Sequence, residues 1–234
     1  SISCVMYHYI KKNNDLFFKN FNKINRKIFK KQINFFEKKF TFLSPDEAKY
    51  LIDKKNINKQ FCWLTFDDGY IEHYEFVLDF LNKKKIKASF FPSLVSLQNI
   101  DFLMPNKIHI LLSKSNSDYL LHLYENIFLS LSLDEKYGDL KKLKKRLVIK
   151  SRFDNYKTSL FKKLCQSTLE DKDSEIIINK MIKIFRVNEK KLLKKFYFNL
   201  KNCIEIYNDG HEIGMHSFTH PRFSNINYNK QKKE

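Results

Sequence analysis

Two adjacent carboxylates, Asp67 and Asp68, stand at a place in the sequence that suits chemistry. They follow an apolar run at residues 61–66 and precede Gly69. Ligands of parallel α/β sheets bind at the carboxyl ends of strands, and a glycine turn there lets both carboxylates reach one pocket. One carboxylate would then be a metal ligand and the other a proton acceptor. The alternative for the dipeptide alone is a helix N-terminus capped by Asp.

Two histidines, His216 and His220, form a second chemical pair. Pro221 disfavours helical geometry at His220, so we expect a turn after a strand and not one face of a helix. Neutral imidazole together with carboxylate is the ligand set of zinc and similar divalent ions. Taken alone, an HxxxH pair is more often a pair of surface histidines, so the histidines gain meaning only together with the aspartates.

The other histidines carry smaller predictions. His8 follows the first apolar run, so it either faces the active site or has a structural role. We expect His73 on a solvated helix face and His211 packed or hydrogen-bonded inside the fold. His109 and His122 lie in a different region of the chain, and no role is assigned to them.

Short apolar runs predict the strands that would position these residues. Residues 2–7 form a short β-prone run. The apolar runs at 61–66 and 88–91 are typical of buried strands, as in a parallel sheet. A further short strand is expected at 212–215, directly before His216. With helical patterns between them, these runs predict an α/β fold.

Four helical patterns accompany the strands. Apolar residues recur at helical spacing in 13–39 and 70–85. A capping box at 44–47, Ser-Pro-Asp-Glu, predicts another helix start. The last helix is expected to run up to Tyr207 and to end at Gly210 in a left-handed cap.

The middle of the chain differs from both ends. Residues 99–196 show lysine-rich helical patterns, including 140–148 and 176–185, and no clear buried strand. We expect a helical insertion that divides one domain into 1–98 and 197–234. Low-complexity coil is the alternative, and the regular spacing of Leu, Ile and Phe argues against it.

The amino-acid composition excludes an intrinsically disordered chain. The positive net charge alone does not identify a binding partner. Hydrophobic residues make up 43% of the sequence, and the net charge is +18 from 44 basic and 26 acidic residues. The charge is compatible with an acidic glycan. Only five residues are arginine and the lysines are spread evenly, so we expect no specific nucleic-acid site.

Cysteine spacing and hydropathy exclude further classes of protein. The four cysteines form no CxxC pair, so we expect buried thiols and no zinc knuckle or disulfide framework. No apolar run is long enough for a transmembrane segment, and no signal peptide is visible. Localisation stays open between the cytoplasm and the cell envelope, and the oligomeric state is not predicted.

Together, the two chemical pairs lie in longer motifs that resemble a known family. TFDDGY at 65–70 and GHEIGMHSFTHP at 210–221 are similar to the first two motifs of the polysaccharide deacetylases, carbohydrate esterase family 4 with the NodB homology domain. VMYHY at 5–9 and ASFF at 88–91 resemble the first and third strands of that family.

The resemblance implies a distorted (β/α) barrel and a metal-dependent deacetylase. Its substrate would be N- or O-linked acetyl groups on a polysaccharide or surface glycan. By position in the motifs, Asp67 is the general base, and Asp68, His216 and His220 bind a divalent metal. Zinc is the first choice, with Co, Ni or Mn as alternatives. The metal polarises the acetyl carbonyl and activates a water, from which Asp67 takes a proton.

The sequence departs from the family pattern after the second motif. The family's Arg-containing motif, its Asp/Trp motif and its late Leu-x-His, which carries the general acid, have no counterpart between His220 and Glu234. We therefore expect a fragment of a longer protein, whose isolated activity is in doubt. The alternative is a non-catalytic glycan-binding or scaffold relative.

Overall fold

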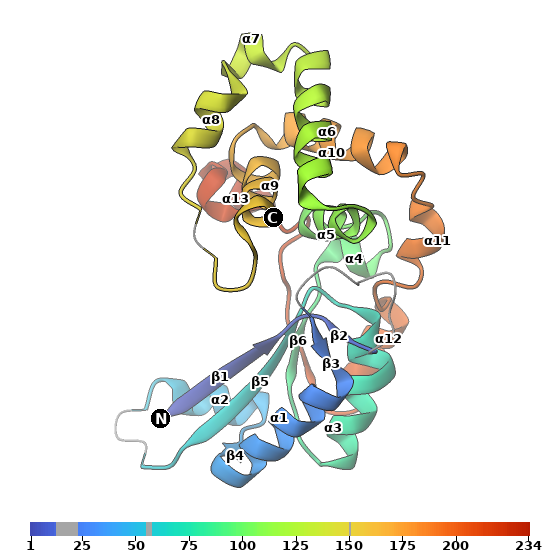
Figure 1. Ribbon diagram of the computed structural model, residues 1–234. Helices are drawn as coiled ribbons and strands as arrows, with labels where there is room; N and C mark the ends of the chain where they lie inside the picture. Colours follow the sequence, from blue (N-terminus) through green and yellow to red (C-terminus); the bar gives the residue numbers. More distant parts are fainter. Residues whose placement is uncertain (13–22, 55–57, 150) are drawn as a thin grey trace. The chain divides into compact units, whose positions relative to one another are not determined.

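The computed structural model describes residues 1–12, 23–54, 58–149 and 151–234 (Figure 1). The described residues form two compact units. The first, here called the sheet unit, comprises those in Ser1–Asn14, Lys23–Phe102 and Glu189–Glu234. The second, here called the helical unit, comprises those in Leu103–Asn188.

The sheet unit is built on a five-stranded sheet. Its strands are β1 (Ile2–Tyr7), β4 (Thr41–Phe42), β5 (Phe61–Asp67), β6 (Ser89–Phe91) and β7 (Glu212–Ile213). The order is β1-β5-β6-β7, β4 pairs with the start of β5, and every pair is parallel. The strands expected from the apolar runs are all present, which confirms the α/β class.

Side-chain alternation gives this sheet two different faces. Leu64 and Phe66 of β5 point to one face, where they join the buried core with Phe90 of β6. Thr65 and Asp67 therefore point to the opposite face. Helices cover the core face, so the Asp67 side chain is directed away from the main core.

Helices of the sheet unit supply the rest of its core. They are α1 (Arg26–Lys39), α2 (Pro45–Ile52), the π-helix η2 (His73–Leu78), α3 (Asp79–Lys83), α4 (Leu94–Leu97), α11 (Glu189–Leu193), α12 (Leu200–Asn208) and α13 (Tyr228–Lys233), with the 3-10 turn η3 (Phe223–Asn225). Phe29 of α1, Leu81 of α3 and Ile206 of α12 are fully buried in the core cluster. The capping box expected at Ser44 is present, with both of its reciprocal hydrogen bonds.

The helix expected over 13–39 begins later than predicted. Ile24 and Asn25 form β3 (Ile24–Asn25), which pairs in parallel with β2 (Ile10–Lys11). Asn25 then caps α1, because its side chain accepts a hydrogen bond from the Ile28 N–H at 2.8 Å. The part of this prediction at 13–22 lies outside the described residues.

Two further predictions in the sheet unit are wrong. His73 is fully buried instead of solvated, because it lies four residues before Val77 on the apolar stripe of its helix. Cys4 is exposed, because in β1 it alternates with the inward residues Val5 and Tyr7. The other three cysteines are buried as expected, and all four are free.

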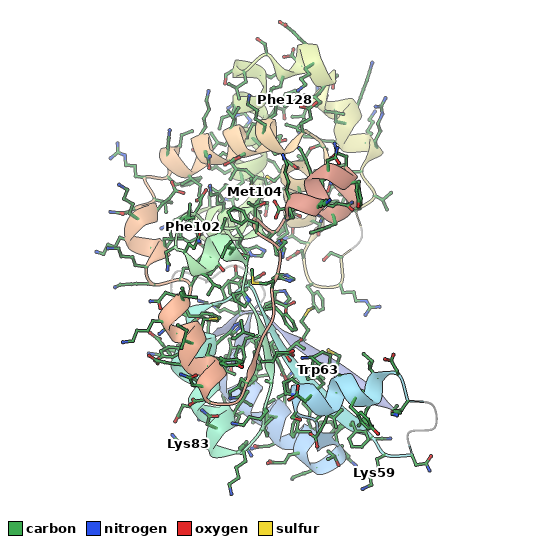
Figure 2. The ribbon with its side chains drawn as sticks, turned by 180° about the vertical axis from the view of Figure 1, so that it is seen from behind. Lys59, Trp63, Lys83, Phe102, Met104 and Phe128 are labelled. Atoms are coloured by element: carbon green, nitrogen blue, oxygen red, sulfur yellow. The ribbon has the colours of Figure 1, made fainter. Side chains whose placement is uncertain are left out.

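The helical unit contains helices and no strand within residues 103–149 and 151–188. Its helices are α5 (Met104–Lys114), α6 (Ser117–Ser130), α7 (Leu133–Tyr137), α8 (Leu140–Arg146), α9 (Tyr156–Ser167) and α10 (Asp171–Ile184). Phe128 lies among them, fully buried like Phe161 and Met181 (Figure 2). No helix among the described residues of the whole chain has the length and apolar composition needed to cross a bilayer.

Candidate metal centre

The loop after β5 carries the two aspartates and depends on a glycine. Asp68 and Gly69 both have positive φ angles, 70° and 73°. A Cβ at Gly69 would also lie 2.9 Å from the Cβ of Pro92, so both conformation and space require glycine there. The Asp68 N–H donates to the Phe91 carbonyl at 2.9 Å. Asp68 therefore lies outside the regular strand. Its side chain does not have to point to the face opposite Asp67, as it would in a continuing strand.

A distant segment holds the same loop in place. The Ile71 N–H donates to the Phe196 carbonyl, and the Phe198 N–H donates to the Gly69 carbonyl, each at 2.9 Å. These partners come from the part of the sheet unit that follows the helical unit in the chain. The aspartate loop is thus fixed by residues that no local sequence pattern connects with it.

The histidine segment follows β7 and runs alongside β6. The Gly214 N–H donates to the Phe90 carbonyl at 2.9 Å and the His216 N–H to the Pro92 carbonyl at 3.1 Å. Gly214 packs so closely on Phe91 that an added Cβ would lie 2.3 Å from the ring. This backbone ladder carries His216 to the end of the sheet where the aspartates lie.

The turn between the two histidines is not helical, as predicted. Ser217 and His220 have positive φ angles, 58° and 61°, and the His220 N–H donates to the Ser217 Oγ at 3.0 Å. The Glu234 carboxylate accepts hydrogen bonds from the N–H groups of Phe218 and Thr219, at 3.0 and 2.7 Å. It also accepts from the Thr219 hydroxyl at 2.7 Å. Sequence reasoning assigned nothing to Glu234, because no local pattern links it to this turn.

Asp68, His216 and His220 come together at this point. The Nε2 atoms of His216 and His220 lie 3.7 and 3.4 Å from Oδ1 of Asp68. The potential ligand atoms of the three residues all lie within 4.8 Å of one another. Across the described residues, no other set of three or more His, Cys, Asp or Glu side chains is gathered in this way.

The donor atoms of this cluster fit a divalent cation. Oδ2 of Asp68 accepts a hydrogen bond from the Tyr70 hydroxyl at 2.7 Å. Oδ1 is buried and has no hydrogen-bond partner within the described part of the chain. Burying an oxygen without a hydrogen-bond partner lowers the stability of the fold by about 1–3 kcal/mol. A cation bound between this oxygen and the two imidazoles would remove that cost. One carboxylate oxygen and two imidazole nitrogens form a zinc-type set with a position left open.

Asp67 lies beside this cluster and is not part of it. Its side chain is buried, with 7% exposed. Burial is the main cause that raises the pKa of the Asp67 carboxyl, and the nearby imidazoles of His8 and His216 act against it. A carboxylate with a raised pKa is a stronger base, which suits a group that accepts a proton.

Of the remaining histidines in the sheet unit, His8 lies near Asp67, and His73 and His211 are buried in the core. His8 is half-buried near Asp67, and its carbonyl accepts a hydrogen bond from Nε2 of His73 at 2.7 Å. His211 is buried, as expected. Its Nδ1 accepts from the Ala88 N–H at 3.2 Å, so Nε2 carries the proton and donates to Oδ1 of Asn82 at 3.0 Å. His73 and His211 are therefore structural.

Comparison with known families gives one match. Residues 54–99 match the family model described as polysaccharide deacetylase. The matched stretch includes Asp67 and Asp68 and ends near the start of the helical unit. No curated protein gives a significant match to this chain.

Three solved structures are similar to parts of the chain. A de-N-acetylase from Aggregatibacter actinomycetemcomitans is 19% identical, with a TM-score of 0.34 over 41% of this chain and 38% of that one. IcaB from Ammonifex degensii is 20% identical, with a TM-score of 0.36 over 48% of each chain. The Streptococcus pyogenes deacetylase PplD is 26% identical, with a TM-score of 0.37 over 47% of this chain and 51% of that one. The chain therefore spans between 38% and 51% of the lengths of these proteins.

Proposed function

We propose that this chain, whose residues 54–99 match the polysaccharide deacetylase family model, removes acetyl groups from a glycan in a metal-dependent reaction. The observation that supports this most strongly is the cluster of Asp68, His216 and His220 beside Asp67. Two stretches of sequence separated by the helical insertion contribute to it. A surface glycan or polysaccharide carrying N- or O-linked acetyl groups is the proposed substrate.

Asp68, His216 and His220 are the proposed metal ligands. Asp68 would contribute Oδ1, and the two histidines would contribute Nε2, which are the atoms that face one another. Zinc is the first choice for this nitrogen and oxygen set, with Co, Ni or Mn as alternatives. When bound there, a divalent ion supplies Lewis-acid activation of the acetyl carbonyl and of a water molecule.

Asp67 is the proposed general base. Its buried carboxylate takes the proton from the water that attacks the acetyl carbon. Burial that raises its pKa strengthens it as a base. The general acid is assigned to no residue of this chain.

We further propose that the parallel sheet is part of a distorted (β/α) barrel. Helices cover the core face of the sheet, and Met6, on the same face as Thr65 and Asp67, is 58% exposed. In a barrel this second face would point inward. The domain division into 1–98, an insertion at 99–196 and 197–234 belongs to the same proposal.

The direct test measures acetate release from acetylated oligosaccharides by the metal-loaded protein. Asp67→Asn should lower the rate at least about 100-fold, which is the usual contribution of a general base, and should keep one bound ion per chain. Asp79→Asn is the matched control, since Asp79 is exposed and pairs with Lys83. Normal activity in Asp67→Asn would remove Asp67 from the mechanism.

A further inference from the structure

Tyr70 touches the candidate metal ligand Asp68 from the side opposite the histidines. Its hydroxyl donates to Oδ2 of Asp68 at 2.7 Å, while Oδ1 faces His216 and His220. The last torsion of an aspartate side chain is soft and has no sharp preference of its own. The hydrogen bond from Tyr70 is therefore the interaction that selects which oxygen faces the histidines.

The ring of Tyr70 is itself held on several sides. It is 1% exposed and stacks on Tyr9, with ring centroids 4.2 Å apart. Tyr197 lies nearly parallel to it at 6.0 Å, and Phe196 meets it edge-on at 5.7 Å. A ring packed in this way has little freedom to swing. Its hydroxyl consequently has a fixed position relative to Asp68.

We propose that Tyr70 is a positioning residue that holds Asp68 for one-oxygen ligation of the metal. The inference rests on the proposed metal site and deepens it. Ligating carboxylates depend on hydrogen bonds from surrounding groups, and loss of such a partner typically weakens metal binding about 10- to 100-fold. Without the hydroxyl, Oδ2 loses its donor and the carboxylate is free to rotate.

The test compares Tyr70→Phe with Tyr7→Phe. Tyr7 is an equally buried tyrosine of the sheet unit, and its hydroxyl donates to Gln32 at 3.1 Å, without contact to Asp68. Zinc affinity is measured by competition with a chromophoric chelator, and the Co²⁺ form is examined by visible absorption. Tyr70→Phe should bind zinc about 10- to 100-fold more weakly and change the Co²⁺ spectrum. Tyr7→Phe should match the wild type in both.

The outcomes separate this inference from the proposed function. If Tyr70→Phe binds zinc as tightly as the wild type with the same Co²⁺ spectrum, the positioning role is wrong and the metal site stands. If the wild type binds no ion, the proposed function fails and the role of Tyr70 falls with it.

A second measurement does not depend on how the variant folds. A crystal structure of the wild-type protein with zinc should show one oxygen of Asp68 at about 2.0–2.2 Å from the metal and the other still bonded to Tyr70. Ligation by both oxygens, or loss of the Tyr70 bond, would overturn the inference.

Discussion

Gly214 illustrates how a single residue serves the candidate metal centre by leaving space. The histidine segment runs so close to β6 that a Cβ at Gly214 would lie 2.3 Å from the Phe91 ring. We expect Gly214→Ala to lower the free energy of unfolding by about 1–3 kcal/mol, because overpacked sites are strained by that amount. Urea denaturation of the wild type and the variant measures the change.

The same contact supplies its own control. Phe91→Ala removes the ring atoms that an added Cβ would meet, so Gly214→Ala should cost much less in the Phe91→Ala background. An equal cost in both backgrounds would mean that the crowding of Phe91 is not what requires glycine.

His73 makes stability depend on pH. Burial lowers the pKa of His73 from 6.5 to about 3. Between these two pH values, His73 is protonated in the unfolded chain and neutral in the folded protein. The stabilisation is complete above pH 6.5 and is lost as the pH falls towards 3. Between pH 7 and pH 5 this one group should lower the free energy of unfolding by about 2 kcal/mol at most.

The pH effect is measured by urea denaturation at pH 7 and pH 5. His73→Gln should reduce the loss between the two pH values, because its side chain does not titrate. His122→Gln, at an exposed histidine of the helical unit, should keep the wild-type loss. If His73→Gln also keeps the full loss, the pH dependence comes from other groups.

At the scale of elements, the turn between the histidines is held by Glu234, which directly follows α13. The Glu234 carboxylate accepts two backbone hydrogen bonds and one hydroxyl hydrogen bond from Phe218 and Thr219. We expect Glu234→Ala to weaken zinc binding about 2- to 10-fold, since the bonds are exposed and each contributes modestly. Chelator competition measures the affinity.

The neighbouring residue Lys232 provides the control for this element. It is exposed on α13, and Lys232→Ala should leave zinc affinity unchanged. Unchanged affinity in Glu234→Ala would show that the histidine turn holds its shape without the Glu234 carboxylate.

Elements marked by local patterns could be predicted from the sequence, and those made by distant contacts could not. β5 was predictable because its apolar run is continuous, and α2 because its capping box is local. β3 was missed because the apolar Ile24 also fits a helical stripe, and its strand character comes from pairing with β2. Likewise, the resemblance of the two motifs to the deacetylases implied that Asp68 would lie near the histidines, whereas the contacts of Tyr70 and Glu234 depend on three-dimensional neighbours.

On the scale of the whole molecule, each of the two compact units buries apolar side chains among its described residues. The candidate ligands all belong to the sheet unit, and Phe128 lies in the core of the helical unit. We expect Phe128→Ala to destabilise the helical unit by about 3–5 kcal/mol and to leave zinc affinity unchanged. Calorimetry with and without zinc should show that the metal raises the unfolding temperature of the sheet unit only.

The insertion hypothesis belongs to the same scale. The helical unit lies in the chain between α4 and α11, and we propose that it influences which glycans the protein accepts or how the protein associates. Deletion of residues 103–188 should change the range of glycans accepted or the association state, measured by acetate release and light scattering. If neither changes, the hypothesis is wrong.

The central claim is that Asp68, His216 and His220 hold one divalent ion, and metal stoichiometry tests it most directly. The wild type and the His216→Ala/His220→Ala double variant are loaded with zinc and freed of excess metal. The zinc content per chain is then measured by inductively coupled plasma mass spectrometry. We predict about one zinc per chain in the wild type and almost none in the double variant, because one carboxylate alone is a weak zinc site. Equal zinc content in both proteins, or no zinc in the wild type, would contradict the account.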